Sequence, residues 1–326
     1  MTDFQTTFSP ALFIKGPLLQ TIVGSQFPGR YSMPTAHYHK LDLGLGDQTY
    51  VLEIESRGNA SSPVVLMAHG MGGCSHSGYM KRITSKLHQR GFPVLLLNQR
   101  GSGASLGMSR RLWNGGDSED LHQAVQFALQ LYPDRDLLIV GFSLSANILL
   151  KYLGEGRDIS SRLQGAFAVN PPVDLRSASH ILSHSPSCCI FNQYYMKLLK
   201  RQLTAVEECF PNSILNKNPR TIWEFDVLYT APAGGFQDVE DYYSKSSSGQ
   251  YLQSIKIPTL LLCSEDDPFI PPDDFKKLKM SQAVSFLNPA YGGHMGYISK
   301  EKTSFGDRRW LDEVLMNWVE DRGPYS

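Results

Sequence analysis

Short, uninterrupted runs of apolar residues recur along the chain and predict buried β-strands. A run without alternation of polar and apolar positions is typical of a strand that helices cover on both faces of a sheet. Six such runs span residues 63–70, 92–101, 137–142, 163–172, 257–267 and 283–289. Helical patterns at 79–91 and 117–133 lie between the earlier runs, and the second opens with acidic residues that suit the positive end of a helix dipole. Strands and helices in alternation predict βαβ units and a mostly parallel, doubly wound α/β sheet.

The pattern changes at two places along the chain. Residues 36–56 alternate polar and apolar positions around a Gly-Asp turn, which predicts an antiparallel hairpin at one edge of the sheet. From about 175 to 253 the sequence is helical and aromatic in character without a strand-like run, and so long a stretch is more than a loop. We therefore predict a core domain formed by residues 1–174 and 254–326, with a helical cap at 175–253 inserted between two strands.

Composition argues against several classes of protein. The 326 residues are 41% hydrophobic with a formal net charge of zero, and no basic run predicts a nucleic-acid or anionic membrane partner. The five cysteines lack C-x-x-C spacing, so we expect reduced thiols in a cytoplasmic protein, with no disulfide framework and no zinc site. No apolar run reaches roughly eighteen residues, the length of a membrane span, and the first residues lack the basic start of a signal peptide. We expect no integral membrane segment.

A serine stands at the bend between the apolar run 137–142 and a helical pattern. A hydroxyl at a sharp strand-to-helix turn is exposed, and the first N–H groups of the helix point at charge that develops beside it. Such a turn leaves room only for small neighbours, and Gly141 and Ser145 flank Ser143 in the pattern G-x-S-x-S. We expect Ser143 to be a nucleophile. Ser145 is the second candidate for the nucleophile, but in the first turn of the helix a serine usually serves the backbone. It stands where G-x-S-x-G has its second glycine, which we expect it to replace.

The glycine-rich segment MAHGMGG, at 67–73, ends the first of the six runs. Glycines such as Gly70 let the backbone approach a substrate carbonyl and offer an N–H group without an obstructing side chain. We expect the backbone N–H groups of Met71 and Leu144 to form an oxyanion hole, and His69 to brace the loop. His76 follows this segment so closely that we keep it as a candidate functional histidine.

Two later strand ends carry acids and a histidine. Asp266 and Asp267 end the run 257–267, and His294 follows the last run on a glycine-flanked loop. Reactive groups of a parallel sheet gather at the carboxyl ends of its strands, so a histidine there can take the serine proton while an acid orients its ring. We prefer Asp267 as this acid, with Asp266 as the alternative. We predict no metal site, because no histidine lies close in sequence to the two acids, and we expect no cofactor.

The segment NQRGSGAS, at 98–105, looks like a phosphate-binding loop. It matches neither G-x-x-x-x-G-K-[ST] nor G-x-G-x-x-G, so we do not predict a nucleotide site. Arg100 within it is expected to pin loops near the serine through charge-assisted hydrogen bonds.

Several of these segments together resemble a known family. They are HGMGG, GFSLSANILLKYLGEG, SEDDPFIP and GGHMGY, with GPLLQTIVG, NQRGSGAS and the block FDVLYTAPAGGFQDVEDYYSKSS inside the predicted cap. The chain resembles the α/β-hydrolases and, more narrowly, the YheT-type bacterial hydrolases, a group related to the membrane-anchored α/β-hydrolase domain lipases of animals. The resemblance implies the α/β-hydrolase fold, with Ser143 as nucleophile, Asp267 as acid and His294 as base. Position 145 departs from the group, which commonly has glycine there.

The leading interpretation is a serine hydrolase, a carboxylesterase or lipase-like enzyme that cleaves a carboxylic ester through an acyl-enzyme. The Phe, Tyr, Leu and Ile residues of the predicted cap indicate a pocket for a small-molecule ester with an apolar acyl group. One alternative is an acyltransferase or thioesterase that uses the same three residues. Another is a non-catalytic binding protein on the same fold.

Overall fold

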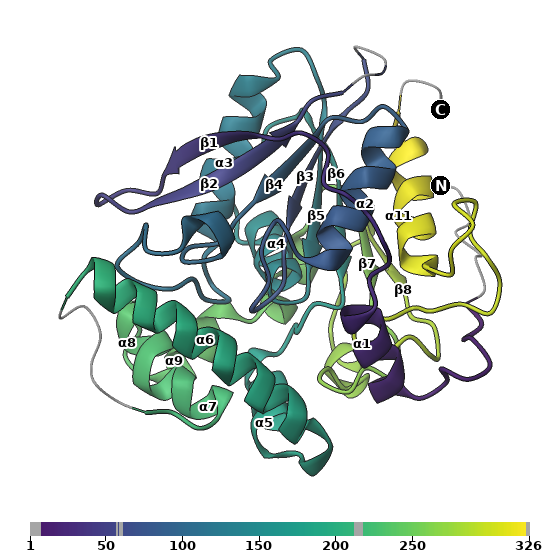
Figure 1. Cartoon of the computed structure of the whole chain (residues 1–326). Coiled ribbons are helices and arrows are strands. Elements are labelled where there is room, and N and C mark those ends of the chain that lie inside the picture. The colour runs from purple at the N-terminus through teal and green to yellow at the C-terminus, as the bar shows by residue number, and fades with distance from the viewer. Residues whose placement is uncertain (1–7, 57, 59–60, 212–217, 324–326) are drawn as a thin grey trace.

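The centre of the molecule is an eight-stranded sheet (Figure 1). The computed structural model describes residues 8–56, 58, 61–211 and 218–323. Its strands are β1 (His37–Asp42), β2 (Gln48–Ile54), β3 (Val64–Ala68), β4 (Val94–Leu97), β5 (Leu137–Phe142), β6 (Leu163–Val169), β7 (Thr259–Leu262) and β8 (Val284–Leu287). They are ordered β1-β2-β4-β3-β5-β6-β7-β8, and β2 runs antiparallel to both of its neighbours while all other pairs are parallel. The predicted mostly parallel sheet with an antiparallel N-terminal edge is confirmed.

Helices lie on both faces of this sheet and beyond one of its ends. They are α1 (Pro17–Gln26), α2 (Gly78–Gln89), α3 (Ser118–Leu131), α4 (Leu144–Gly154), α5 (Leu175–His184), α6 (Cys189–Cys209), α7 (Ile222–Phe225), α8 (Ala231–Ala233), α9 (Val239–Ser246), α10 (Asp273–Lys276) and α11 (Trp310–Glu320). Among the helices in the described ranges, none is long and apolar enough to cross a membrane.

The central strands are apolar on both faces because each face supports its own core. In β5, Leu138 and Val140 belong to the core that includes side chains of α2 and α11. Leu137 and Ile139 belong to the core that includes side chains of α3 and α4. Successive residues of a strand point to opposite faces, so a continuous apolar run supplies both cores at once.

Helices α5 to α9 lie together below the sheet in Figure 1. They follow β6 and precede β7, and the described part of residues 175–253 contains helical segments and no strand. Since α5 begins a few residues beyond the carboxyl end of β6, this helical segment stands over the end of the sheet where the strands finish. The division into two domains at residues 174 and 254 stays a prediction.

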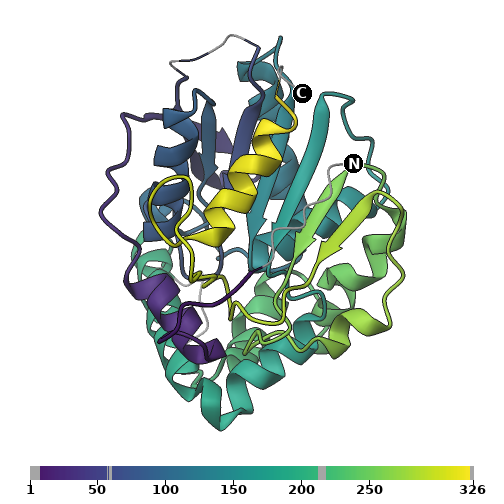
Figure 2. The same ribbon diagram turned by 90° about the vertical axis from the view of Figure 1, so that its right-hand side faces the viewer.

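The sequence patterns predicted neither α1 nor α11, and α1 bears on the site. Pro17 occupies the first helical position of α1, where its missing N–H is not needed. A Cβ atom on Gly24 would lie 2.7 Å from the Cα atom of Gly296, so the backbone of α1 touches a C-terminal loop directly. The buried Gln20 side chain bonds both backbone groups of Ile298, at 3.1 Å to its carbonyl oxygen and 2.7 Å from its N–H. Figure 2 shows α1 (purple) beside the yellow C-terminal loops, far from it in sequence.

Candidate active site

The turn from β5 into α4, residues 141–145, forms a strained elbow. Ser143 has φ 52° and ψ −120°, a conformation that is rare for a residue with a side chain and that concentrates at functional sites. A Cβ atom on Gly141 would lie 2.7 Å from the carbonyl oxygen of Ser145 and 2.8 Å from Cα of Ala146, so only glycine fits there. The elbow is held by a hydrogen bond of 2.8 Å from the Ser143 N–H to the carbonyl oxygen of Val169 on β6.

Ser143, His294 and Asp267 form a continuous chain of hydrogen-bonding atoms. Ser143 Oγ lies 2.9 Å from His294 Nε2, and His294 Nδ1 lies 2.8 Å from Asp267 Oδ2. Both the histidine and the aspartate are buried. With the Nδ1 proton donated to the carboxylate, Nε2 is left to accept the serine proton. The fold thus brings together three side chains that the sequence separates by 151 and 27 positions.

The two neighbouring aspartates face different partners. Besides His294, Asp267 accepts hydrogen bonds at Oδ1 from the N–H groups of Phe269 (2.8 Å) and Ile270 (3.2 Å). Asp266 instead accepts a bond of 2.8 Å from the N–H of Gly293, and burial raises the pKa of its carboxyl group. Asp267 therefore contacts the imidazole, while Asp266 contacts the backbone of the loop that carries it.

Asn170 and Thr21, which the sequence did not predict, hold Asp267 and His294 in place through hydrogen bonds. Asn170, at the end of β6, donates a bond of 2.7 Å to Asp267 Oδ2 and has a φ of 46°, a left-handed conformation that asparagine tolerates. Thr21, on α1, accepts a bond of 2.9 Å from the His294 N–H and donates one of 2.7 Å to the Pro17 carbonyl. An asparagine directly after a buried strand was a signal for the first. No local pattern pointed to the second.

The loop after β3 packs tightly against the elbow. A Cβ atom on Gly70 would lie 3.0 Å from the Cβ atom of Ser143. The buried His69 ring accepts a bond of 3.1 Å at Nε2 from the Gln99 N–H, so its Nδ1 donates the bond of 2.8 Å to the Gly70 carbonyl. Burial lowers the pKa of His69 to about 4, which keeps the ring neutral. Ser145 Oγ donates a bond of 2.5 Å to the His69 carbonyl and accepts one of 2.9 Å from the Gln99 amide. The Ser145 hydroxyl thus links α4 to this loop.

Two other residues singled out in the sequence lie elsewhere. Arg100 bonds Asp120 on α3 and Asp47 in the β1–β2 turn, at 2.5 Å each, and lines neither of the pockets that contain Ser143. The His76 ring contacts Ser75 and Tyr38 and does not reach Ser143 or His294. Across residues 8–56, 58, 61–211 and 218–323, no three His, Cys, Asp or Glu side chains are grouped to hold a metal ion.

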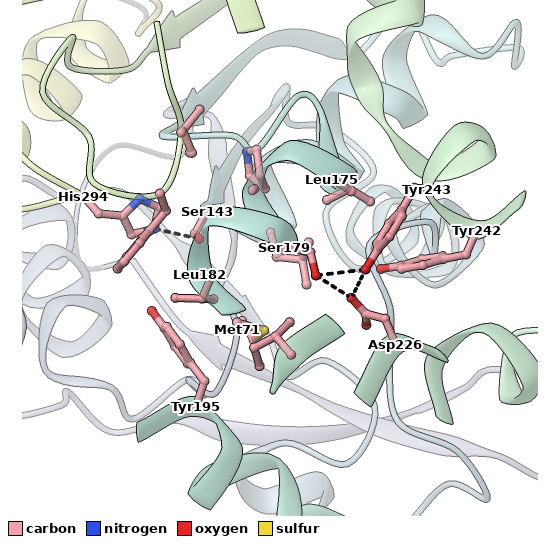
Figure 3. A pocket seen from close by; sticks show the side chains of 16 residues that line it. Met71, Ser143, Leu175, Ser179, Leu182, Tyr195, Asp226, Tyr242, Tyr243 and His294 are labelled. Carbon is pink, nitrogen blue, oxygen red and sulfur yellow. Dashed lines mark hydrogen bonds between the residues drawn. The ribbon is translucent and has the colours of Figure 1, made fainter. Parts of the chain in front are cut away.

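Two spaces meet at Ser143. The inner pocket, with ≈ 600 Å³ of empty space that is partly open to solvent, is lined in part by side chains of α5, α6, α7 and α9. Figure 3 shows the side chains around it. The outer groove, with ≈ 1480 Å³, lies between α1, the loop after β3 and α6. Both are lined by Met71, Ser143, Tyr195 and His294. Leu144 lines the inner pocket and opens α4, where N–H groups have no partner within the helix.

The chain belongs to the alpha/beta hydrolase fold family, whose pattern matches residues 63–301. This range contains strands β3 to β8 and the Ser143, Asp267 and His294 positions. The resemblance inferred from the motifs is confirmed, and the predicted fold class with it.

Curated relatives carry the names of esterases and lipases, which supports a hydrolase. The medium-chain fatty acid ethyl ester synthase/esterase 2 of Saccharomyces cerevisiae is 30% identical, over 78% of this chain and 62% of its own length. A monoacylglycerol lipase of the same yeast is 28% identical, over 80% and 59%. The chain therefore spans about three-fifths of these two proteins. The putative esterase YheT of Escherichia coli is 27% identical, over 92% and 89%.

Solved structures share the fold at low sequence identity. An esterase of Pyrococcus furiosus has a TM-score of 0.55 at 17% identity, covering 89% of this chain and 97% of that one. The 2,6-dihydroxy-pseudo-oxynicotine hydrolase has a TM-score of 0.59 at 17% identity, covering 93% and 71%.

Proposed function

We propose that the protein is a serine hydrolase that cleaves carboxylic esters with Ser143 as nucleophile, His294 as general base and Asp267 as the acid that orients the histidine. The observation that carries the proposal is the hydrogen-bonded chain from Ser143 Oγ through the His294 ring to Asp267 Oδ2, at distances of 2.9 and 2.8 Å. A serine hydroxyl is a weak nucleophile until a histidine takes its proton, and this geometry provides that transfer.

The reaction follows from these positions in two halves. Ser143 Oγ attacks the acyl carbon while His294 Nε2 takes its proton, and the Asp267 carboxylate stabilises the imidazolium. The backbone N–H groups of Met71 and Leu144 bind the oxygen that becomes negative. His294 then protonates the leaving alkoxide, which departs as the alcohol. A water molecule, deprotonated by His294, attacks the acyl-enzyme and releases the carboxylic acid.

The two spaces at Ser143 suit the two arms of an ester. We assign the acyl arm to the inner pocket, whose walls include Leu144, Leu182, Ile222 and Phe269, because apolar walls favour an apolar acyl group. We assign the alcohol arm and the attacking water to the outer groove, which is larger and includes polar side chains of α1.

Acyl transfer to an alcohol is the second candidate. It is favoured by the relative named as an ethyl ester synthase as well as an esterase. An alcohol in the outer groove would discharge the acyl-enzyme in place of water. Formation of ethyl ester from an activated ester in aqueous ethanol, quantified against free acid, separates the two outcomes: ester formation well above the ethanol-to-water ratio identifies a transferase.

The first test is labelling with a fluorophosphonate, followed by mass spectrometry of the adduct. We expect a single adduct on Ser143, no adduct in Ser143→Ala, and a loss of ester hydrolysis of roughly 10⁶-fold in that variant. Ser145→Ala is the matched control because it removes a hydroxyl two positions away, and its adduct is expected to stay on Ser143. An adduct on another serine, or none on the wild type, would overturn the proposal.

A further inference from the structure

The inner pocket has a polar end that the proposed reaction does not use. Asp226, Ser179 and Tyr243 line the pocket together with apolar side chains. Figure 3 shows these three residues on the side of the pocket away from Ser143 and His294. They come from three elements: Ser179 from α5, Asp226 from the π-helical turn Asp226–Thr230, and Tyr243 from α9. We call these three residues the distal cluster.

The distal cluster is rich in hydrogen-bond acceptors. Asp226 Oδ2 lies 2.9 Å from Tyr243 Oη and 3.2 Å from Ser179 Oγ, and these two hydroxyl oxygens are 2.9 Å apart. Thr230 Oγ1 donates a bond of 2.7 Å to the other carboxyl oxygen, Oδ1. Two hydroxyl protons cannot fill three short contacts among three oxygens when the carboxyl group is ionised. Lone pairs are therefore left that a donor in the pocket can use.

A buried carboxyl group of this kind ordinarily has a cationic partner. Asp226 is only 8% exposed, and the residues that line the inner pocket include no lysine and no arginine. Burial raises the pKa of Asp226 to about 6, which agrees with the lack of a cation. Joining α5, the π-helical turn and α9 would not require a carboxyl group, because apolar side chains can pack helices without this desolvation cost.

Three of the residues that meet at this end of the pocket come from one stretch of sequence. It is the block FDVLYTAPAGGFQDVEDYYSKSS, to which the ester chemistry at Ser143 gives no role. Asp226, Thr230, Tyr242 and Tyr243 all belong to this block. Asp226, Thr230 and Tyr243 of this block are joined to one another by hydrogen bonds.

We propose that the distal cluster is a subsite for a hydrogen-bond donor, a hydroxyl or an ammonium group, carried by the acyl arm of the substrate. The inference rests on the proposed function for the position of the ester at Ser143, and it adds the substrate class: esters of hydroxy or amino acids with an apolar stretch between the carbonyl and the donor. A plain hydrocarbon chain of the same length would press against the carboxyl group without bonding it.

The test compares p-nitrophenyl esters of equal chain length whose acyl chains end in a methyl, a hydroxyl or an ammonium group. The readout is the ratio of kcat/KM between a donor-tipped ester and the methyl-tipped ester, so a general loss of activity cancels. For the wild type we expect the ratio to exceed one at the chain length that reaches the cluster. Asp226→Asn and Ser179→Ala are expected to lower it roughly tenfold, the value of one hydrogen bond to a charged group. The hydroxyl and ammonium series identify which donor is preferred.

Asp274→Asn is the matched control. Asp274 is a partly buried carboxyl group that also accepts a bond from a serine, Ser177, and whose pKa burial likewise raises to about 6, but it lies outside the pocket. Its substitution should leave the ratio at the wild-type value. If Asp226→Asn does not fold, Ser179→Ala reports on the same ratio.

A second measurement needs no turnover and separates this inference from the proposed function. In Ser143→Ala, an α,ω-alkanediol should raise the Tm more than the alkanol of the same length, and Asp226→Asn should remove the difference. A wild-type ratio below one for both donors at every length, with equal Tm shifts for diol and alkanol, would overturn the subsite. Absence of p-nitrophenyl acetate hydrolysis would overturn the proposed function alone, because an acetyl group is too short to need the subsite.

Discussion

The serine and the histidine of the site are held in place in different ways. Ser143 is fixed by residues within a few positions of it and by the neighbouring strands β3 and β6, through Gly141, Ala146 and the carbonyl of Val169. The His294 ring is held by Asp267, and its backbone N–H is held by Thr21 on α1, a residue 273 positions away. The position of Ser143, the serine side of the site, is therefore determined largely by a short sequence motif. The position of His294, the histidine side of the site, depends also on α1, which no motif around His294 predicts.

The strongest way to break the serine side is Gly141→Ala. The added methyl group would lie 2.7–2.8 Å from backbone atoms of Ser145 and Ala146. Backbone atoms cannot rotate away from it as a flexible side chain could. We expect a loss of about 3 kcal/mol in the free energy of unfolding, measured with urea, and no fluorophosphonate adduct. The control is Gly16→Ala at the N-cap of α1, where a Cβ atom meets nothing within 4 Å and the expected loss is about 1 kcal/mol or less. Equal effects of the two substitutions would contradict the steric argument.

The pH dependence of the free energy of unfolding tests the buried contacts of His69, in the loop that packs against Ser143. Its pKa is lowered from 6.5 to about 4 in the folded protein, so between these values the unfolded chain binds a proton that the folded protein does not. The free energy of unfolding should therefore fall as the pH drops from 6.5 to 4, by about 3 kcal/mol from this residue. His69→Gln lacks this titration, whereas all carboxyl groups titrate in both proteins. The difference in urea midpoint between wild type and variant should be smaller at pH 4 than at pH 7. An equal difference at both pH values would refute the assignment.

Thr21→Val is the matching change on the histidine side. It keeps the shape of the side chain but leaves the buried His294 N–H without its acceptor, which costs about 2 kcal/mol. We expect kcat for p-nitrophenyl acetate to fall while the fluorophosphonate adduct stays on Ser143. Thr21→Ser retains the hydroxyl and should behave nearly as wild type. Unchanged kcat and stability in Thr21→Val would show that the loop carrying His294 does not need the bond to Thr21.

The smallest expected effect is that of Ser145→Gly, which restores the more common elbow sequence. It removes the hydroxyl that joins α4 to the His69 carbonyl and to Gln99, and we expect a loss of about 1 kcal/mol with labelling of Ser143 retained. Ser145→Ala distinguishes loss of the hydroxyl from the added backbone freedom of glycine. A more stable Ser145→Gly variant would mean that serine is merely tolerated at this position.

The sheet could be read from the sequence because its signals are local. The run at 137–142 predicted β5 at its observed bounds, and the alternation at 36–56 predicted both strands of the edge hairpin. Continuous apolar runs arise from burial on two faces, which each strand records in its own residues. The order of the strands is a property of their pairing and could not be read in this way.

The rest of the site could not be predicted because its determinants are distant in sequence. Thr21 and Gln20 lie in a mildly apolar segment without a motif, and their partners His294 and Ile298 are 273 and 278 positions away. The preference for Asp267 over Asp266 likewise had no basis in spacing. It depends on which carboxyl group faces the imidazole once β7 and the loop after β8 are side by side.

The contact between Gln20 and Ile298 also sets an order of events during protein synthesis. The ribosome makes Gln20 first and reaches Ile298 only 278 residues later, an interval of roughly 15 to 55 seconds at ordinary elongation rates. A ten-residue segment such as α1 is too short to be a stable helix in water alone, so it waits for its partner loop. The nascent chain can therefore fold most of its sheet on the ribosome while the histidine is still unplaced. The contact between Thr21 and the His294 backbone can therefore form only after the loop that carries His294 has been made.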